Sequence, residues 1–267
     1  MKAAAQTMPS EEFRVASTAS GGVVPESRAA RAYRRIYSAL CGIQPDLRPW
    51  HYQWLSATLL TRTFRALLPP LSGRVLDVGC GEKPYRALFD RPAEYVGLDI
   101  AAGPKVDIVV RPGERWPLSD GQFDVLISNQ VLEHVADLDF TLAEMKRVVK
   151  PGGTVVVSIP FIYNEHGSPN DFQRFTVHRA RQLFEGFEEL RLERQGGIGS
   201  TIAILTLNWA ELALSATKTG RFLKAPLLPF WLLFSLILNL GGLAVNAIDP
   251  TQSFYSNLVL VLRKPAL

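Results

Sequence analysis

Two glycines and a downstream aspartate are the first residues whose types and spacing indicate chemistry. Gly79 and Gly81 follow the apolar run Val75–Val78, and Asp99 closes the next apolar run. Glycine in a tight turn after a strand accepts positive φ angles and lets the backbone approach a ligand closely. A carboxylate at the end of the following strand can accept hydrogen bonds from both hydroxyls of a ribose. The combination favours a nucleoside ligand over an ordinary connection between a strand and a helix.

Two kinds of nucleoside ligand fit this pattern. A dinucleotide site needs a third glycine three residues after the second, so that a helix N-terminus can receive the pyrophosphate. Pro84 occupies that position, and Glu82 lies in the loop, where a carboxylate repels phosphate. S-adenosylmethionine carries no phosphate, and its sulfonium and ammonium groups tolerate nearby carboxylates. The acidic loop therefore favours S-adenosylmethionine.

A second polar segment, residues 164–176, follows the β-branched run Thr154–Ile159. We expect this segment at the carboxyl edge of a sheet, where a methyl acceptor would approach. His166 has the pKa class needed to take a proton from a hydroxyl acceptor, and Asp171 could orient its ring. The alternative is that Asp171 and Arg174 form a structural ion pair.

Composition narrows the class of protein. The 267 residues are 47% hydrophobic and 20% charged, and a net charge of +4 is too mild to indicate a nucleic-acid partner. Neither the two cysteines, Cys41 and Cys80, nor the four histidines have the spacing of a metal site. We therefore predict no metal, no disulfide framework and a reducing compartment. The mean hydropathy of +0.08 is high for a soluble enzyme, and the excess lies near the C-terminus.

The candidate residues need a scaffold in which strands and helices alternate. Short apolar runs predict strands over 74–78, 95–99, 106–110, 123–128, 154–159 and 187–192. Helices are predicted over 51–68, 84–89, 139–150 and 176–184. This alternation predicts an α/β protein with a doubly wound, mainly parallel sheet, which binds ligands outside the carboxyl ends of its strands.

Four motifs stand in one order along this scaffold. They are Leu76–Gly81, Gly97–Asp99, Phe123–Val125 together with Val131–Val135, and Arg147–Gly153. In these four motifs and their order, the chain resembles class I S-adenosylmethionine-dependent methyltransferases, a broad group that includes small-molecule and quinone methylating enzymes. The resemblance implies a Rossmann-like, seven-stranded sheet whose last strand is antiparallel, and residues 257–262 suit that strand.

The resemblance also implies roles for individual residues. Asp77, Gly79 and Gly81 would cradle the methionine portion of the cofactor, with Cys80 in the same turn. Asp99 would hold the ribose, Ile100 would lie beside the adenine, and Asn129 would lie near the methionine end. Residues 166–176 are similar to a His-Gly-x-Pro-x-Asp-Phe-x-Arg-Phe-Thr segment of some bacterial members of the group.

The chain is expected to divide into five parts. Residues 1–27, rich in Ala, Ser and Gly, are predicted to be a flexible tail, and residues 28–70 an N-terminal helical cap. Residues 71–197 would form the cofactor-binding core, and residues 251–267 would add its last strand. Residues 198–250, between them, are predicted to be an apolar helical insertion.

This insertion is unusually poor in charge. Ile198–Thr217 contains Glu211 as its only charge, and Ala225–Ile248 contains none, so the second run could span a bilayer by its length. The last strand must return to the same sheet, which requires an even number of crossings. Two crossings would leave three basic residues outside, against the positive-inside tendency. A hairpin that dips into one leaflet or lies in the interface avoids this problem, and an apolar lid or a homodimer interface is the alternative.

We therefore predict a cytoplasmic methyltransferase that is peripheral to the inner face of a membrane. Its predicted reaction is O-methylation of a lipid or of a lipid-linked acceptor, glycan or quinone-like, with S-adenosylmethionine as the methyl donor. Two alternatives remain open: a soluble small-molecule methyltransferase with a hydrophobic lid or dimer insertion, and a non-catalytic S-adenosylmethionine-binding protein.

Overall fold

A seven-stranded mixed sheet forms the centre of the molecule. The computed structural model describes residues 28–44, 46–90 and 92–266, and the predicted flexible tail, residues 1–27, lies outside the described residues. The strands are β3 (Gly73–Val78), β4 (Pro92–Asp99), β5 (Ile108–Val109), β6 (Phe123–Asn129), β7 (Val149–Pro160), β8 (Glu188–Gln195) and β9 (Asn257–Arg263). Their order is β5-β4-β3-β6-β7-β9-β8, and β9 runs antiparallel to both of its neighbours. The predicted Rossmann-like sheet with an antiparallel last strand is confirmed.

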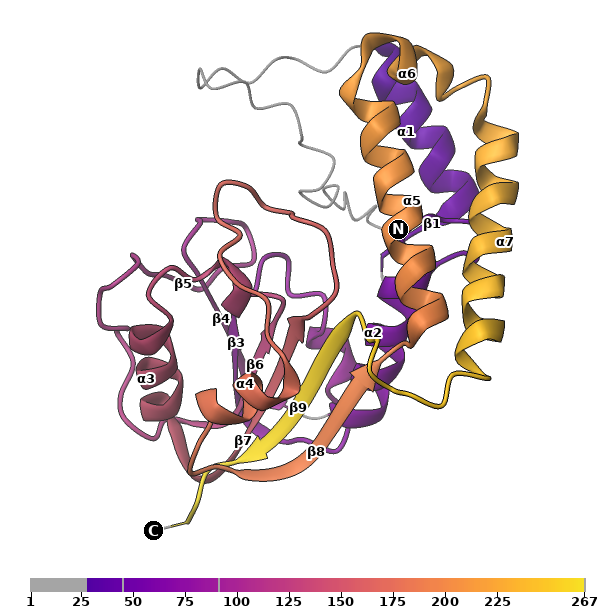
Figure 1. Ribbon diagram of the computed structural model, residues 1–267. Helices are drawn as coiled ribbons and strands as arrows, with labels where there is room; N and C mark the ends of the chain where they lie inside the picture. The colour runs from indigo at the N-terminus through magenta and orange to yellow at the C-terminus, as the bar shows by residue number, and fades with distance from the viewer. Residues whose placement is uncertain (1–27, 45, 91, 267) are drawn as a thin grey trace.

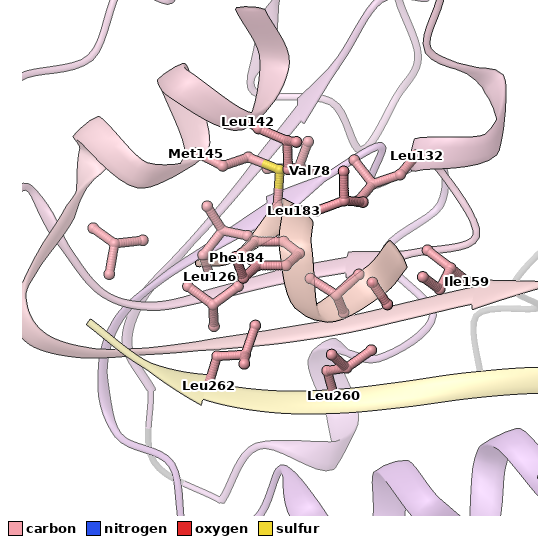
Figure 2. Close-up of a cluster of buried hydrophobic side chains, with 14 of the residues drawn as sticks. Val78, Leu126, Leu132, Leu142, Met145, Ile159, Leu183, Phe184, Leu260 and Leu262 are labelled. Atoms are coloured by element: carbon pink, nitrogen blue, oxygen red, sulfur yellow. The ribbon is translucent and has the colours of Figure 1, made fainter. Parts of the chain in front are cut away.

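Both faces of this sheet are covered, because side chains alternate between faces along each strand. On one face, α3 (Leu138–Val148) and α4 (Val177–Leu183) pack over Leu76, Leu126 and Leu260. Figure 2 shows Met145 and Phe184 filling the space between these helices and the strands. On the other face, α2 (Trp54–Leu67) packs over the alternate valines of the same strands.

The connection after β3 differs from the prediction. The helix expected over 84–89 is a single 3₁₀ turn, η2 (Arg86–Leu88). Gly81 and Lys83 have φ angles of 46° and 54°, so the chain is in left-handed turn conformations until just before Pro84. Phe89, directly after this turn, is already extended at φ −87° and ψ 124°, so the helical conformation ends after one turn.

Two other boundaries also shift. The helix predicted over 139–150 ends at Val148, because Val149 is buried and pairs with Phe123 as the first residue of β7. Pro151, Gly152 and Gly153, the turn-forming residues of the motif Arg147–Gly153, are therefore part of β7, with Gly152 at a φ of 76°. The strand predicted over 106–110 is reduced to Ile108–Val109.

The insertion before β9 is helical, as predicted. It consists of α5 (Ile198–Ala216), the short α6 (Lys218–Leu223) and α7 (Leu228–Asn246). In Figure 1 these helices stand beside the sheet with α6 at the end farthest from it, and α1 (Arg28–Cys41) lies alongside them. The small hairpin of β1 (Gly42–Ile43) and β2 (Asp46–Leu47) follows α1.

The segment 28–70 has two packing environments. Tyr37 and Cys41 of α1 pack against Leu207 of α5 and against apolar residues of α7. Phe64 of α2 instead packs against the sheet. The first helix therefore extends the insertion, while the second is one layer of the sheet domain.

Candidate active site

The turn after β3 opens the site at the carboxyl edge of the sheet. Gly79 and Gly81 have φ angles of 69° and 46°, a region that residues with a Cβ rarely adopt. A Cβ at Gly79 would lie 2.3 Å from Val131, whereas a Cβ at Gly81 would meet no atom within 4 Å. Gly79 therefore permits close packing of the turn, and Gly81 borders open space in which a ligand can approach the backbone.

Asp99 ties the ends of two strands together. Its Oδ2 accepts a hydrogen bond from the Gly81 N–H at 3.0 Å, and its Oδ1 accepts one from the Ala101 N–H at 3.1 Å. The neighbouring Ile100 is 64% exposed. The turn, the carboxylate and an exposed apolar side chain thus lie next to one another, as a nucleoside site requires. These residues fit S-adenosylmethionine, because Gly81 borders open space for a ligand and the adjacent Asp99 carboxylate can accept hydrogen bonds from ribose hydroxyls.

Asp77 lies beneath this turn, at 3% exposure. Burial raises the pKa of its carboxyl to about 7, although the Tyr95 hydroxyl donates a hydrogen bond to it at 2.7 Å and opposes the shift. An ionised carboxylate is costly in such a place unless a cation compensates it. The ammonium of a bound amino acid group is one cation that could do so.

Contacts of Cys80 and Lys83 stabilise the conformation of the turn after β3. The Cys80 N–H donates to Leu98, its carbonyl accepts from Lys83, and its side chain packs against Gly97. The Lys83 ammonium pairs with Asp107, whose Oδ2 also accepts the Gly97 N–H at 2.6 Å. Because these polar groups are satisfied within the protein, Cys80 supports the conformation of the turn.

Asn129, the last residue of β6, lies at the same edge. It donates a hydrogen bond to the Tyr85 hydroxyl at 2.8 Å and accepts one from the Ser158 hydroxyl at 2.5 Å. Tyr85 belongs to the connection after β3, so Asn129 links three neighbouring parts of the edge. Neither Tyr85 nor Ser158 was expected in the site, because nothing in their spacing distinguishes them from core residues.

The loop after β7 holds His166 and Asp171 together. Asp171 accepts the His166 N–H at 2.8 Å, and its Oδ2 lies 3.6 Å from His166 Nδ1. Both of its oxygens also accept hydrogen bonds from the Arg174 guanidinium, at 2.5 and 2.7 Å. Arg174 therefore lowers the pKa of Asp171 to about 2. Asp171 therefore forms the ion pair with Arg174 and the contact with His166 at the same time.

Two further residues, Glu133 and His134, lie next to His166. They come from the 3₁₀ turn η3 (Leu132–His134) that follows β6, and His134 and His166 have ring centroids 4.7 Å apart. Although burial opposes it, the pKa of His166 is raised, because Glu133, the Asn164 carbonyl and Asp171 favour its charged form. In the sequence both residues belong to the motif Val131–Val135, and their positions in it indicate no catalytic role for either side chain.

Asn164 connects this loop to the insertion. Its carbonyl accepts a hydrogen bond from Arg174 at 2.9 Å and lies 3.3 Å from His166 Nδ1. Its side-chain oxygen accepts a hydrogen bond from Asn208 of α5 at 2.7 Å. An asparagine in the middle of an apolar helix was the one available signal of this contact, and sequence reasoning missed it.

Comparison with known proteins gives matches that are concentrated in the sheet domain. Residues 76–157 match the family described as methyltransferase domain. An uncharacterized methyltransferase of Mycobacterium leprae is 38% identical over 141 residues, 48% of this chain and 47% of the relative. The ubiquinone biosynthesis O-methyltransferase of Rhizobium rhizogenes is 31% identical over 108 residues, 33% of this chain and 42% of the relative. The chain spans about half the length of the first of these relatives and less of the second.

A solved structure supports the fold over a longer stretch. The crystal structure of the cyclase SpnF superimposes with a TM-score of 0.51 and 20% identity, covering 79% of this chain and 82% of that one. At this identity the likeness concerns the fold alone. Residues 76–157, from β3 to β7, therefore form a methyltransferase domain with the class I fold, and its methyl donor is S-adenosylmethionine.

Proposed function

We propose that the protein transfers a methyl group from S-adenosylmethionine to an oxygen of a lipid or lipid-linked acceptor at a membrane surface. The main supporting observation concerns the hairpin formed by α5 and α7, which is apolar and largely exposed. Asn208 of this hairpin contacts Asn164, which belongs to the loop that holds His166. An acceptor whose tail lies along the hairpin would present its head group to that loop.

In this proposal the cofactor occupies the turn after β3. Asp77, Gly79 and Gly81 hold the methionine portion, with Cys80 maintaining the turn. Asp99 accepts hydrogen bonds from the ribose hydroxyls, and Ile100 covers the adenine. Asn129 faces the methionine end from β6. The support is the common position of these residues at one edge of the sheet.

The transfer itself is an in-line displacement. A bond forms between the acceptor oxygen and the methyl carbon while the sulfur–methyl bond breaks, and S-adenosylhomocysteine leaves. Such a step depends mainly on positioning, and a hydroxyl acceptor must also lose its proton. We assign proton removal to His166. Asp171 is the positioning residue, because it accepts the His166 backbone N–H and lies close to the ring atom Nδ1.

The insertion supports a membrane-facing role by its exposed surface. Two of its helices, α5 and α7, are long and apolar enough to cross a membrane by length and composition, and only 39% and 22% of their apolar windows are buried. Phe222 is 80% exposed and Phe230 is 72% exposed. Further exposed apolar residues are Ile202, Trp209, Leu212, Leu233, Ile237 and Leu240. Removing a side chain of this size from water is worth about 1.5–3 kcal/mol, so these side chains favour an apolar partner.

The buried contacts of α5 and α7 also support a lipid partner, because several of them are polar. Ser235 and Asn239 of α7 are fully buried, and Asn239 donates hydrogen bonds to the carbonyls of Pro49 and His51. Helices α5 and α7 approach closely where Gly199 faces Gly242, so that a Cβ at Gly199 would lie 2.4 Å from the Gly242 carbonyl oxygen. Small residues and polar contacts inside, with apolar side chains outside, are typical of helices packed in lipid.

Helix α1 favours an interfacial position over a crossing. It packs along the hairpin through Tyr33 and Tyr37, and it carries Arg28, Arg31 and Arg35 on exposed positions. A hairpin that crossed the bilayer would carry these arginines into the hydrocarbon. A hairpin lying in one leaflet leaves them among the head groups, where anionic lipid attracts them.

The acceptor class follows from the same position. A relative in Rhizobium rhizogenes carries a name that describes O-methylation in ubiquinone biosynthesis, which supports a quinone-like ring or another lipid-linked head group. Since S-adenosylmethionine is a cytoplasmic metabolite, we place the protein at the inner face of the membrane.

Label transfer tests the reaction. The full chain is incubated with methyl-labelled S-adenosylmethionine and a total lipid extract, and we expect label in the organic phase that is stable to mild base, as an ether is. Label only in water-soluble products would favour the soluble small-molecule alternative. Cofactor binding without any transfer to either fraction would favour a non-catalytic binding protein.

Vesicle flotation tests the location. We expect the full chain to float with vesicles that contain an anionic lipid, and the double variant Phe222→Ser/Phe230→Ser to float less. Val109→Ser removes an apolar side chain of β5 that is 53% exposed, and it serves as the control. A chain that stays with the soluble fraction as a monodisperse dimer would make the hairpin a subunit interface instead.

A further inference from the structure

Three potential metal ligands converge beside the proposed acceptor site. Glu133 and His134 come from the turn after β6, and His166 comes from the loop after β7. His134 Nε2 lies 3.8 Å from Glu133 Oε1, and His166 Nε2 lies 3.7 Å from the same oxygen. One ligand atom from each of the three residues falls within 4.8 Å of the other two.

Glu133 is the unusual member of this group. Its side chain is 0% exposed, and neither carboxylate oxygen has a hydrogen-bond partner among the described residues. A buried carboxylate without hydrogen bonds is costly, and proteins compensate it with a cation held close by. Both nearby nitrogens lie beyond hydrogen-bond distance of Oε1, so the direct contacts do not satisfy it.

The two histidines aim the same ring atom at this carboxylate. His134 Nδ1 lies 2.6 Å from the Asn170 carbonyl oxygen and must therefore carry the proton in that hydrogen bond. His166 Nδ1 lies 3.3 Å from the Asn164 carbonyl oxygen and 3.6 Å from Asp171 Oδ2, two acceptors that favour a proton on this nitrogen, while the Arg174 guanidinium approaches it at 3.4 Å. A backbone carbonyl on one ring nitrogen is the usual way in which a metal-binding histidine is oriented, because it leaves the lone pair of the other nitrogen free.

We propose that Glu133, His134 and His166 bind a divalent transition-metal ion of the zinc type. Two imidazoles and a carboxylate are a known ligand set for zinc, which bonds nitrogen and oxygen at about 2.0–2.2 Å. Tetrahedral bonds of that length separate ligand atoms by about 3.3 Å. The observed separations of 3.7 and 3.8 Å from Glu133 Oε1 are a few tenths of an ångström longer, and the two histidine ligand atoms, which lie within 4.8 Å of each other, must also approach when an ion binds. The nitrogen-rich set disfavours magnesium and calcium, which prefer oxygen.

The ion would have a fourth position for an exogenous oxygen, since the protein supplies three ligands. In a role that rests on the proposed function, the acceptor hydroxyl takes this position. The ion lowers the hydroxyl pKa, the proton leaves to solvent, and the metal-bound oxygen attacks the methyl carbon. His166 then promotes proton removal as a ligand, because its Nε2 cannot hold a metal and a proton together.

Metal titration tests the site without any acceptor. The full chain, free of any histidine tag, is titrated with Zn²⁺ by calorimetry and with Co²⁺ by visible absorption, and we expect one ion per chain with a four-coordinate cobalt spectrum. Glu133→Gln, His134→Gln and His166→Gln should each weaken binding by more than about 100-fold, beyond the 10–100-fold effect of an outer-shell change. His178→Gln, an exposed histidine of α4, should bind as the parent does.

Two further variants protect the test against loss of fold. Glu133→Gln removes an uncompensated buried charge, so without metal it should unfold at the same temperature as the parent or higher. His166→Cys keeps a ligand, so it should still bind cobalt and add a sulfur-to-cobalt absorption band. No stoichiometric binding by the parent, or binding unchanged in Glu133→Gln and His166→Gln, overturns the site and leaves a histidine proton as the cation beside Glu133.

The role of the ion is read separately. If metal binds but label transfer is the same before and after chelation, the acceptor role is wrong while the metal site stands. If no acceptor is labelled under any condition, the proposed function fails, and the calorimetric and cobalt titrations still decide the metal site.

Discussion

Asn208 of α5 donates a hydrogen bond to the side-chain oxygen of Asn164 across 2.7 Å, and this contact joins the insertion to the loop of the active site. The backbone carbonyl of Asn164 lies 3.3 Å from His166 Nδ1. The helix that carries the exposed apolar surface is therefore two contacts away from the imidazole. Apolar packing of Tyr163 near Leu55, Ala203 and Ile204 strengthens the same connection.

We expect Asn208→Leu to weaken this connection. The change leaves the Asn164 side-chain oxygen without its donor, a loss of about 0.5–1.5 kcal/mol, so kcat/KM for a lipid acceptor should fall roughly 2- to 12-fold. Thr206→Val, in the same helix, is the control. Calorimetry should give the same affinity for S-adenosylhomocysteine in both variants. An unchanged kcat/KM would mean that the contact is structural only.

Asp99→Ala should weaken binding of S-adenosylmethionine and S-adenosylhomocysteine by about 1.5–3 kcal/mol, roughly 10- to 150-fold. The substitution removes the contact that holds the Gly81 N–H and, in the proposed site, the charge-assisted hydrogen bonds to the ribose. Asp139→Ala, which removes an exposed carboxylate from α3, is the matched control. Calorimetry that detects tight binding of a nicotinamide dinucleotide, and none of S-adenosylhomocysteine, would contradict this assignment of the site.

His166→Ala should lower turnover by about 10²–10⁴ while the affinity for the cofactor changes little. The reason is that His166 lies in the loop after β7, whereas the residues proposed to hold the cofactor lie at the ends of β3, β4 and β6. His178→Ala is the control for removal of an imidazole. A variant that keeps its rate would show that the loop histidine is structural, and circular dichroism would reveal a variant that has lost its fold.

Asp77 makes stability depend on pH. Its folded-state pKa of about 7 exceeds the ordinary value of 3.8, so the folded state retains a proton that the unfolded chain releases between these values. The parent should therefore lose stability as the pH rises from about 4 to 7. Asp77→Asn lacks this loss, so its free energy of unfolding relative to the parent should increase by about 2–4 kcal/mol between pH 4 and pH 8.

Urea unfolding of both proteins at the two pH values gives this difference directly. Asp90→Asn, which removes an exposed carboxyl, should show no comparable change. Equal pH dependence in Asp77→Asn and the parent would mean that Asp77 is ionised in the folded protein at neutral pH. Added S-adenosylhomocysteine should reduce the difference, because its ammonium would compensate the Asp77 carboxylate.

The sheet and the cofactor turn could be predicted from the sequence because their signals are local. Val75–Val78 and Thr154–Ile159 are apolar runs of strand length, and Gly79 and Gly81 mark the turn whatever lies around it. Their order along the chain then limits the topology, since parallel strands need crossovers and the carboxyl ends meet at one edge. The charge-poor insertion was equally visible, because a run without charges needs no partner to be recognised.

Only the tertiary structure decided the contacts between segments distant in sequence. Glu133 and His134 are adjacent residues with no metal-ligand spacing, and His166 joins them because β6 and β7 are neighbours in the sheet. Asn208 reaches Asn164 because α5 packs beside the loop. The helix expected over 84–89 is one 3₁₀ turn, because the chain before it is in left-handed turn conformations at Gly81 and Lys83 and the chain after it is extended at Phe89. Local pattern determines which elements form, whereas burial and pairing between elements decide which side chains share a site.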